Sequence, residues 1–366
     1  MDKNLGLCKD WILNSGIQSE IGGFYSWYDL ERKTYSYLYS EITGYGITTL
    51  LLLNSLYNKK LYVDRAEKAA AWIIKSAMHD CGGVRTRLYK DDKKADIGYS
   101  FSGARIFSFD TGIVLYGMAN LYRVTDKKKY LNAALRLADF LLDKMQKEDG
   151  SLAPIYDANI DEVIEPSDKW SNQSGAFHAK VALGLVDLFK LTEDKRYKEA
   201  AIRLCEYAVS TQDKSGRFIT NRAAKTTHIH PHSYATEGLW YTGTVFNIPG
   251  FISSAKKATE WTFVHVFSSG ISELYEPSTE RFNDFQRSDI LAQALRLGII
   301  FSFKNKIGLL KSALLKYQLV ESSSAQKGGF LYSKEDKHVN SWCSMFAFQA
   351  LAFCKDNKSA KAQIFI

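Results

Sequence analysis

A glycine-containing turn recurs six times along this 366-residue chain at nearly constant intervals. The copies begin at the following glycines, with successive separations of 60, 68, 66, 54 and 58 residues: Gly22, Gly82, Gly150, Gly216, Gly270 and Gly328. Aromatic or extended-type residues follow the turn, as in Gly22-Gly23-Phe24-Tyr25. A repeat of this length indicates one supersecondary unit per copy. This periodicity therefore restricts the possible folds strongly.

The segment between two turns has room for two helices with different surfaces. Residues 174–191 are apolar nearly all round, whereas residues 197–208 carry apolar side chains at three-and-four spacing beside a charged face. A buried inner helix followed by an amphipathic outer helix explains both patterns. The chain has only five prolines, which agrees with long helices.

The helix count predicts a closed ring. Residues 2–14 form an outer-type helix with no inner partner before it, and residues 339–354 form an inner-type helix with no outer partner after it. We therefore predict an all-α fold, a single (α/α)6 barrel of six helical hairpins over residues 1–366. The N-terminal helix pairs with the last inner helix, and residues 356–366 form a polar tail. An open solenoid is the alternative, and it would not require the terminal helices to pair.

The composition is that of a globular protein, with 46% hydrophobic and 24% charged residues. No apolar run approaches the roughly 18 residues that a membrane span needs, so no membrane insertion is expected. The N-terminus lacks the basic segment followed by an apolar segment that is typical of a signal peptide, so a cytoplasmic location is expected. The five cysteines include no CxxC pair and are expected to be reduced thiols. The oligomeric state is left open.

Charge and aromatic content narrow the class of partner. The net charge is +8, and aromatic residues make up 13% of the chain, a content that suits a groove for flat ligands such as sugars. Guanidinium groups bind carboxylates through two parallel hydrogen bonds, so an acidic oligo- or polysaccharide is the expected substrate. No nucleic-acid-binding motif and no phosphate-binding glycine loop occurs, so neither nucleic acid nor a nucleotide cofactor is expected.

The glycine turns precede the inner helices, so the inner-helix N-termini converge on one mouth. Helix N-termini favour anionic groups, and we expect the chemistry there. The candidate catalytic residues are Glu41, Asp110, His232, Glu237 and Asp284. The candidate substrate-binding residues are Tyr45, Arg85, Trp170, His230, Tyr234, Arg281, Arg287, His338 and Trp342.

Each candidate has a structural alternative. Glu41, Asp110 and Asp284 are placed to serve as helix caps or first-turn acids. Glu237 falls a turn or more inside an apolar helix, where a buried hydrogen bond to a neighbouring helix is the alternative role. The three alternating histidines of residues 228–232 have no cysteine nearby, so no metal site is predicted. The alternative for the arginines is that they lie on the solvent-exposed rim of the mouth and bind no substrate.

The chain resembles a known family in four short motifs. They are Ser40-Glu41-Ile42-Thr43-Gly44-Tyr45, Phe109-Asp110-Thr111-Gly112, His230-Pro231-His232-Ser233-Tyr234-Ala235-Thr236-Glu237-Gly238 and Gln286-Arg287-Ser288-Asp289. Together these look like the VpsJ-type polysaccharide biosynthesis proteins, within the wider six-hairpin toroid superfamily. That superfamily includes unsaturated glucuronyl hydrolases, sugar 2-epimerases, glucuronyl C5-epimerases and polysaccharide lyases. The resemblance implies the fold and a carbohydrate substrate. The chain has no close match to the second aspartate pattern of the unsaturated glucuronyl hydrolases.

Three reactions suit the predicted mouth. Glycoside hydrolysis needs an acid and a second carboxylate, for which we select Asp110 and Glu237, because carboxylates recur at the inner-helix starts. A lyase or C5-epimerase needs a base, for which His232 or Tyr234 is the candidate, and an acid, for which Tyr45 is the candidate. It also needs cations that stabilise the enolate, and Arg281 and Arg287 are the candidates. A 2-epimerase would use His232 and His338. A non-catalytic glycan-binding toroid in a polysaccharide biosynthesis complex is the alternative from another class.

Overall fold

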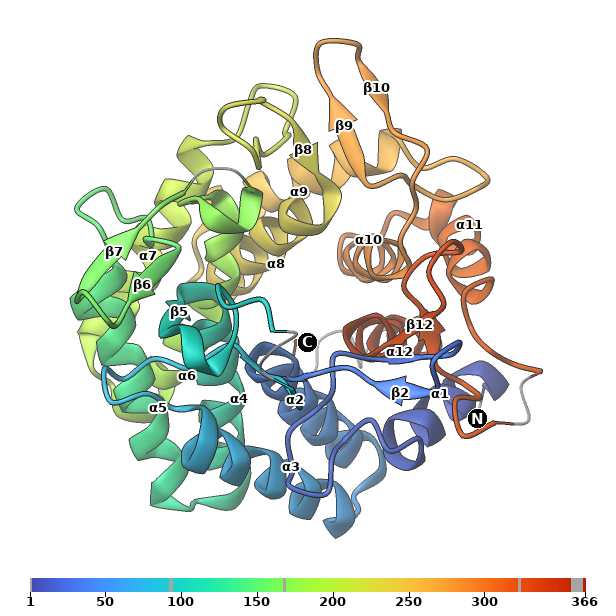
Figure 1. Ribbon diagram of the computed structural model, residues 1–366. Helices are drawn as coiled ribbons and strands as arrows, with labels where there is room; N and C mark the ends of the chain where they lie inside the picture. Colours follow the sequence, from blue (N-terminus) through green and yellow to red (C-terminus); the bar gives the residue numbers. More distant parts are fainter. Residues whose placement is uncertain (1, 92–94, 167–168, 322–323, 357–364) are drawn as a thin grey trace.

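The computed structural model describes residues 2–91, 95–166, 169–321, 324–356 and 365–366. Twelve α-helices in this part of the chain form two concentric rings, and Figure 1 looks along the common axis. The outer helices are α1 (Lys3–Asn14), α3 (Lys60–Trp72), α5 (Lys128–Phe140), α7 (Lys195–Ser210), α9 (Pro249–Val264) and α11 (Lys304–Leu315). The inner helices are α2 (Ser40–Tyr57), α4 (Ser108–Thr125), α6 (Ala182–Thr192), α8 (Ile229–Phe246), α10 (Ser288–Ile300) and α12 (Ser341–Lys355).

The ring is closed by contacts between the two ends of the chain. Helix α12 packs against both α1 and α2, and every other inner helix also packs against the next one along the chain. Alternation of an apolar helix with an amphipathic one produces this arrangement, because the apolar helix is buried only when its neighbours surround it. The predicted all-α barrel is confirmed, and the open solenoid is excluded.

The six repeat glycines all have a left-handed backbone conformation, which glycine adopts more readily than other residues. Their φ angles are positive, between +85° at Gly150 and +114° at Gly270. At Gly328 a Cβ atom would lie 2.1 Å from the carbonyl oxygen of Leu7 in α1. The turn thus needs glycine for two reasons, the left-handed conformation and the close approach to an outer helix.

A glutamine completes most of these turns. Gln146 Nε2 donates to the carbonyl oxygens of Gly150 at 3.2 Å and of Ala200 in α7 at 3.0 Å. The glutamines that make the equivalent bonds in other hairpins are Gln18, Gln212 and Gln318. One side chain therefore joins each of these turns to an outer helix.

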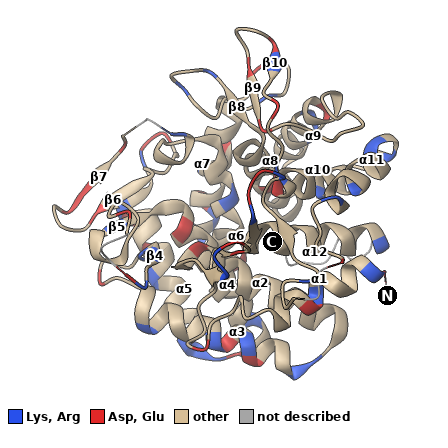
Figure 2. Cartoon of the chain, turned by 45° about the vertical axis from the view of Figure 1, so that its right-hand side comes forward, with Lys and Arg blue, Asp and Glu red and all other residues tan. Residues whose placement is uncertain are grey.

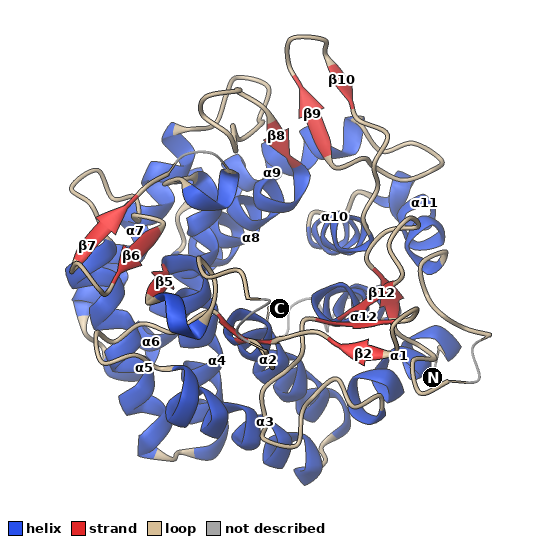
Figure 3. Ribbon diagram, viewed as in Figure 1, coloured by secondary structure: helices blue, strands red, loops and turns tan. Residues whose placement is uncertain are grey.

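Short antiparallel strands in the loops are a feature that the sequence analysis does not predict (Figure 3). The ones that shape the mouth are β1 (Trp27–Asp29) with β12 (His338–Asn340), β3 (Leu38–Tyr39) with β4 (Arg87–Leu88), β5 (Arg105–Phe107) with β6 (Ile155–Asp157), and β8 (Thr227–His228) with β9 (Leu274–Glu276). The others are β2 (Thr34–Tyr35), β7 (Glu162–Ile164), β10 (Arg281–Phe282) and β11 (Phe330–Leu331). Strands β3, β5, β8 and β12 lead directly into inner helices, so their pairing fixes neighbouring helix starts relative to one another.

The last two residues depart from the predicted polar tail. Phe365 and Ile366 are buried, and the C-terminal end lies near the centre of the ring (Figure 1). The backbone N–H of Phe365 donates to the Tyr116 hydroxyl at 2.9 Å, and that of Ile366 donates to Gln349 Oε1 at 3.1 Å. Their apolar side chains gain burial in the ring. Residues 357–364 of the predicted tail lie outside the described residues.

Lys and Arg residues are scattered over outer helices such as α3 and α11 (Figure 2). The five cysteines are unpaired. In the described part of the chain, no helix combines the length and the apolar character needed to cross a membrane.

Candidate active site

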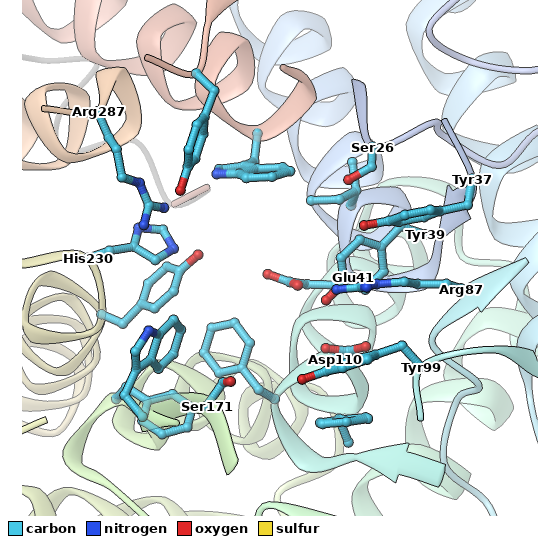
Figure 4. A pocket seen from close by; sticks show the side chains of 18 residues that line it. Ser26, Tyr37, Tyr39, Glu41, Arg87, Tyr99, Asp110, Ser171, His230 and Arg287 are labelled. Carbon is cyan, nitrogen blue, oxygen red and sulfur yellow. The ribbon is translucent and has the colours of Figure 1, made fainter. Parts of the chain in front are cut away.

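A pocket opens at the mouth of the barrel, where inner helices begin (Figure 4). Its volume is about 260 Å³, close to the lower end of small-molecule sites. The lining residues are Ser26, Tyr37, Tyr39, Glu41, Ile42, Arg87, Tyr99, Phe107, Phe109, Asp110, Trp170, Ser171, Phe177, His230, Tyr234, Arg287, Tyr332 and Trp342. They come from the starts of the six inner helices and the loops before them, so only the closed ring brings them together.

Two carboxylates lie on one wall of the pocket. Glu41 is in the first turn of α2 and Asp110 is in the first turn of α4. These helices pack against each other, and Figure 4 shows both side chains beside Arg87. Helix N-termini stabilise negative charge, which makes this position suitable for acids.

The two carboxylates have different affinities for protons. Burial raises the pKa of Glu41 to about 7, while interactions with Tyr39 and Arg87 act in the opposite direction. Burial and the neighbouring charge of Glu41 raise the pKa of Asp110 well above its usual value. Two close carboxylates do not both ionise readily, so the raised pKa of Asp110 favours its protonated form while Glu41 is the member that ionises first. The pair thus holds an acid beside a potential base.

The opposite wall is a hydrogen-bonded group around a buried aspartate. Asp289 accepts from Arg287 Nε at 3.1 Å and Nη2 at 2.5 Å, and from Trp342 Nε1 at 3.0 Å. Arg287 Nη1 also donates to Glu273 Oε1 at 2.6 Å. The guanidinium of Arg287 is therefore shared by two carboxylates. The charge of Arg287 holds the pKa of Asp289 below its usual value despite burial.

His230 belongs to this wall and points its ring into the pocket (Figure 4). Its Nδ1 lies 2.8 Å from Gln293 Oε1 and 3.3 Å from Asp289 Oδ2. Both oxygens accept hydrogen bonds, so the proton is assigned to Nδ1 and Nε2 carries the lone pair. Burial lowers the pKa of His230 to about 4, which keeps the ring neutral. His230 can therefore accept a hydrogen bond from a ligand hydroxyl.

Aromatic rings form much of the remaining surface. Phe109 packs between Tyr234 and Phe177, with ring centroids 4.8 Å and 5.5 Å away. Trp170 packs edge-on against Phe177 at 5.2 Å. Apolar faces with a few polar groups between them are typical of sugar sites.

The pocket contains half of the predicted site residues. Those that line it are Glu41, Asp110, Trp170, His230, Tyr234, Arg287 and Trp342. Tyr45 is buried and interacts with Tyr234 behind the pocket surface.

Glu237, selected as the second catalytic carboxylate, lies outside the pocket lining and is fully buried. Its Oε2 is 2.7 Å from Lys180 Nζ and its Oε1 is 2.7 Å from Arg296 Nη2. This is the alternative role, a buried bond to neighbouring helices. The carboxylate beside Asp110 is Glu41 instead, because α2 and α4 are neighbours in the ring.

The two histidines predicted for a 2-epimerase are not brought together in the pocket. His232 is buried, with Nδ1 accepting from the Phe218 N–H at 3.2 Å and Nε2 placed 3.1 Å from the carbonyl oxygen of Ala258. His338 stacks on Trp27, with centroids 5.0 Å apart, outside the pocket lining. Both rings are engaged in structural contacts, so this prediction is not supported by the geometry.

The remaining predicted residues lie in loops away from the pocket. Arg281 and Asp284 are exposed, in or next to the β9–β10 hairpin that projects from the ring (Figure 1). Arg85 points away, with Nη1 3.4 Å from the carbonyl oxygen of Ser76. Within the described chain, no group of three or more His, Cys, Asp or Glu is arranged to hold a metal ion.

Sequence reasoning missed the tyrosines that surround the carboxylate pair, and it named their arginine only among the basic residues of the mouth-side loops, without selecting it for the site. These residues are Tyr37, Tyr39, Arg87 and Tyr99. Tyr39 and Arg87 face each other across the β3–β4 pair. The only signal in the sequence was the position of Arg87 shortly after a glycine turn, and strand pairing was needed to place it.

The fold and the site define a protein of the (α/α)6 toroid class with a pocket suited to carbohydrate. Residues 87–246 match the family described as Glycosyl Hydrolase Family 88. The matched segment begins at Arg87 and includes Asp110 and His230, but it does not reach Glu41. No curated protein sequence matches the chain.

Solved structures with the same fold include both epimerases and hydrolases. A sugar epimerase from a ruminal bacterium has a TM-score of 0.76 at 11% identity, over 95% of this chain and 98% of that one. A cellobiose 2-epimerase from Bacillus thermoamylovorans has a TM-score of 0.75 at 12% identity, over 95% and 98%. An unsaturated glucuronyl hydrolase from a Bacillus species has a TM-score of 0.70 at 12% identity, over 97% of both chains. At these identities the likeness establishes the fold.

Proposed function

We propose that this protein is a glycoside hydrolase that acts on an acidic, uronate-type oligo- or polysaccharide. The observation that carries the proposal is the pair of carboxylates, Glu41 and Asp110, with different proton affinities in one pocket. The match to a family of glycosyl hydrolases over residues 87–246 supports the same reaction class.

Asp110 acts as the general acid. Its carboxylic acid gives a proton to the glycosidic oxygen while the bond between that oxygen and the anomeric carbon breaks. Glu41, as the carboxylate, removes a proton from the water whose oxygen bonds to the anomeric carbon. The products are two saccharides, and the proton gained by Glu41 returns to Asp110 through solvent. A base with a pKa of about 7 suits this work near neutral pH.

The test is mass spectrometry of acidic glycans incubated with the protein in heavy water. Products that gain the mass of one water at a new reducing end support hydrolysis. Asp110→Asn and Glu41→Gln should each lower kcat by about 10²- to 10⁴-fold, the usual contribution of a general acid or base. Asp284→Asn is the control, because Asp284 is exposed and outside the pocket lining.

Epimerisation is the second candidate, and His230 is the observation that favours it. Its Nε2 carries the lone pair and its ring faces the pocket from the wall opposite the carboxylates. Several solved structures of the same fold are described as epimerases or isomerases. Deuterium uptake into an intact sugar, lost in His230→Gln, would establish this reaction. Cleavage without added water would indicate a lyase.

The resemblance to VpsJ-type proteins supports a place in polysaccharide biosynthesis. A glycan that raises the melting temperature but never changes mass would support the alternative, a non-catalytic glycan-binding toroid in a biosynthetic complex. Unchanged function in Asp110→Asn and Glu41→Gln would support it as well.

A further inference from the structure

An acidic substrate needs a cation in the pocket that is available to bind it. Two arginines line the pocket, Arg87 and Arg287. Arg287 is already bound by two carboxylates, Asp289 at 2.5 Å and Glu273 at 2.6 Å. The charge of this group is fully balanced by its own protein partners, so it offers little attraction to a further anion.

Arg87 has a different environment. Its guanidinium carbon lies over three tyrosine rings, at 4.8 Å from Tyr37, 5.2 Å from Tyr39 and 4.1 Å from Tyr99. The aromatic faces hold the cation by electrostatic attraction and do not occupy its N–H donors. Tyr89 also interacts with it.

The donors of Arg87 are not taken up by a protein carboxylate. Among the described residues, none has a carboxylate oxygen within 4.0 Å of its guanidinium nitrogens. Its Nε is buried and has no hydrogen-bond partner in this part of the chain. A half-buried cation with no carboxylate in direct contact is less stable than a paired one, and an incoming anion relieves that penalty.

Arg87 is also next to the reacting groups. Its positive charge opposes the rise in the pKa of both Glu41 and Asp110. In Figure 4 its side chain runs beside these carboxylates toward the pocket. An anion held by Arg87 therefore belongs to the sugar residue that reacts.

We propose that Arg87 is the specificity-determining residue, whose guanidinium binds the carboxylate of the acidic sugar in the pocket. This inference rests on the proposed function, because it assumes a carbohydrate with a carboxylate. The sequence analysis counted Arg87 among the basic residues near the mouth but selected Arg85, Arg281 and Arg287 for this task. A guanidinium presents two parallel donors to a carboxylate, and the three tyrosines fix its orientation.

The experiment compares two aryl glycosides that differ only at C6, a p-nitrophenyl glucuronide and the matching glucoside, in both anomeric forms. We expect Arg87→Gln to lower the ratio of kcat/KM for glucuronide to that for glucoside by about 10- to 100-fold, the usual range for losing charge-assisted hydrogen bonds. Arg87→Lys should restore part of the ratio. Arg85→Gln is the matched control and should leave the ratio unchanged.

A different result is expected if Arg87 only adjusts the pKa values of Glu41 and Asp110 and does not bind the substrate. Both substrates would then lose activity equally, the pH profile would shift, and the ratio would stay constant, which would overturn the proposal. Circular dichroism spectra of the variants check that they are folded.

Calorimetry separates this proposal from the hydrolase proposal. If the wild-type protein hydrolyses neither glycoside, its binding of glucuronate and glucose is measured directly. Preference for glucuronate that disappears in Arg87→Gln supports the assignment of Arg87 even though hydrolysis fails. Equal or absent binding of both sugars by the wild-type protein overturns it.

Discussion

Replacing Glu237 by glutamine should destabilise the protein strongly, because this carboxylate is paired with two buried cations. Lys180, Glu237 and Arg296 are each at most 1% exposed. Glutamine has nearly the same shape but no charge, and its single carbonyl oxygen can serve only one of the two cations well. Lys180 and Arg296 also donate to the backbone oxygen of Ile366, which remains in the variant.

The magnitude follows from the type of interaction. Removing one partner of a buried ion pair typically costs about 3–5 kcal/mol, because the other charge stays buried without compensation. Burial lowers the pKa of Lys180 to about 8, and the charge of Glu237 opposes this effect. Without Glu237 the pKa of Lys180 falls further, so the lysine sheds its proton more readily at high pH. The destabilisation should therefore be largest near pH 6 and smaller near pH 9.

Urea unfolding followed by circular dichroism at pH 6 and pH 9 measures this effect. The control is Asp284→Asn, an exposed acid, for which a change within about 0.5 kcal/mol is expected. Activity of Glu237→Gln is measured well below its unfolding transition. A variant with unchanged stability but kcat reduced by 10³-fold or more would refute the reasoning and return Glu237 to the catalytic pair.

Three further predictions follow from buried groups. Burial raises the pKa of Glu41 from 4.5 to about 7, so the stabilisation that its protonated form gives below pH 4.5 is lost as the pH rises toward 7. Glu41→Gln should therefore flatten the pH dependence of the melting temperature between these values. An unchanged slope would contradict this. Gly238→Ala places a Cβ 2.1 Å from a carbonyl oxygen in η6 (Ala176–Val181) and should lower the free energy of unfolding by about 1–3 kcal/mol. Gly250→Ala, where the new Cβ has nothing within 4 Å, should not destabilise the protein. Equal effects of the two substitutions on urea unfolding would be inconsistent with this packing. Asp289→Asn should lower kcat/KM at least 10-fold, because it removes the carboxylate that holds Arg287, His230 and Trp342 in place on this wall. Wild-type kinetics would show that this wall is not used.

Several features of the barrel could be read from local sequence. The repeat glycines predicted turns, and in the structure all six glycines, including Gly22 and Gly328, have a positive φ. The alternation of apolar and amphipathic helices predicted which ring each helix joins. These are properties of single turns and helices, so a periodic pattern is sufficient to reveal them.

The partners of charged residues could not be read in the same way. Asp110 lines the pocket, but the sequence analysis paired it with Glu237, whereas the carboxylate beside it is Glu41. A carboxylate inside a helix gives no local sign of the cations that face it. Lys180 and Arg296 lie 57 and 59 residues away from Glu237 in sequence.

The sequence by itself thus determined the ring of hairpins and the mouth at which the chemistry gathers, because short-range periodicity controls helix type and turn position. The tertiary structure alone decided which charges are balanced inside the protein and which remain available in the pocket. Arg287 and Arg87 are both arginines close to inner-helix starts, yet one is held by carboxylates and the other by tyrosine rings. That difference depends on strand pairing and helix packing between distant segments, and electrostatic interactions follow distance in space rather than separation along the chain.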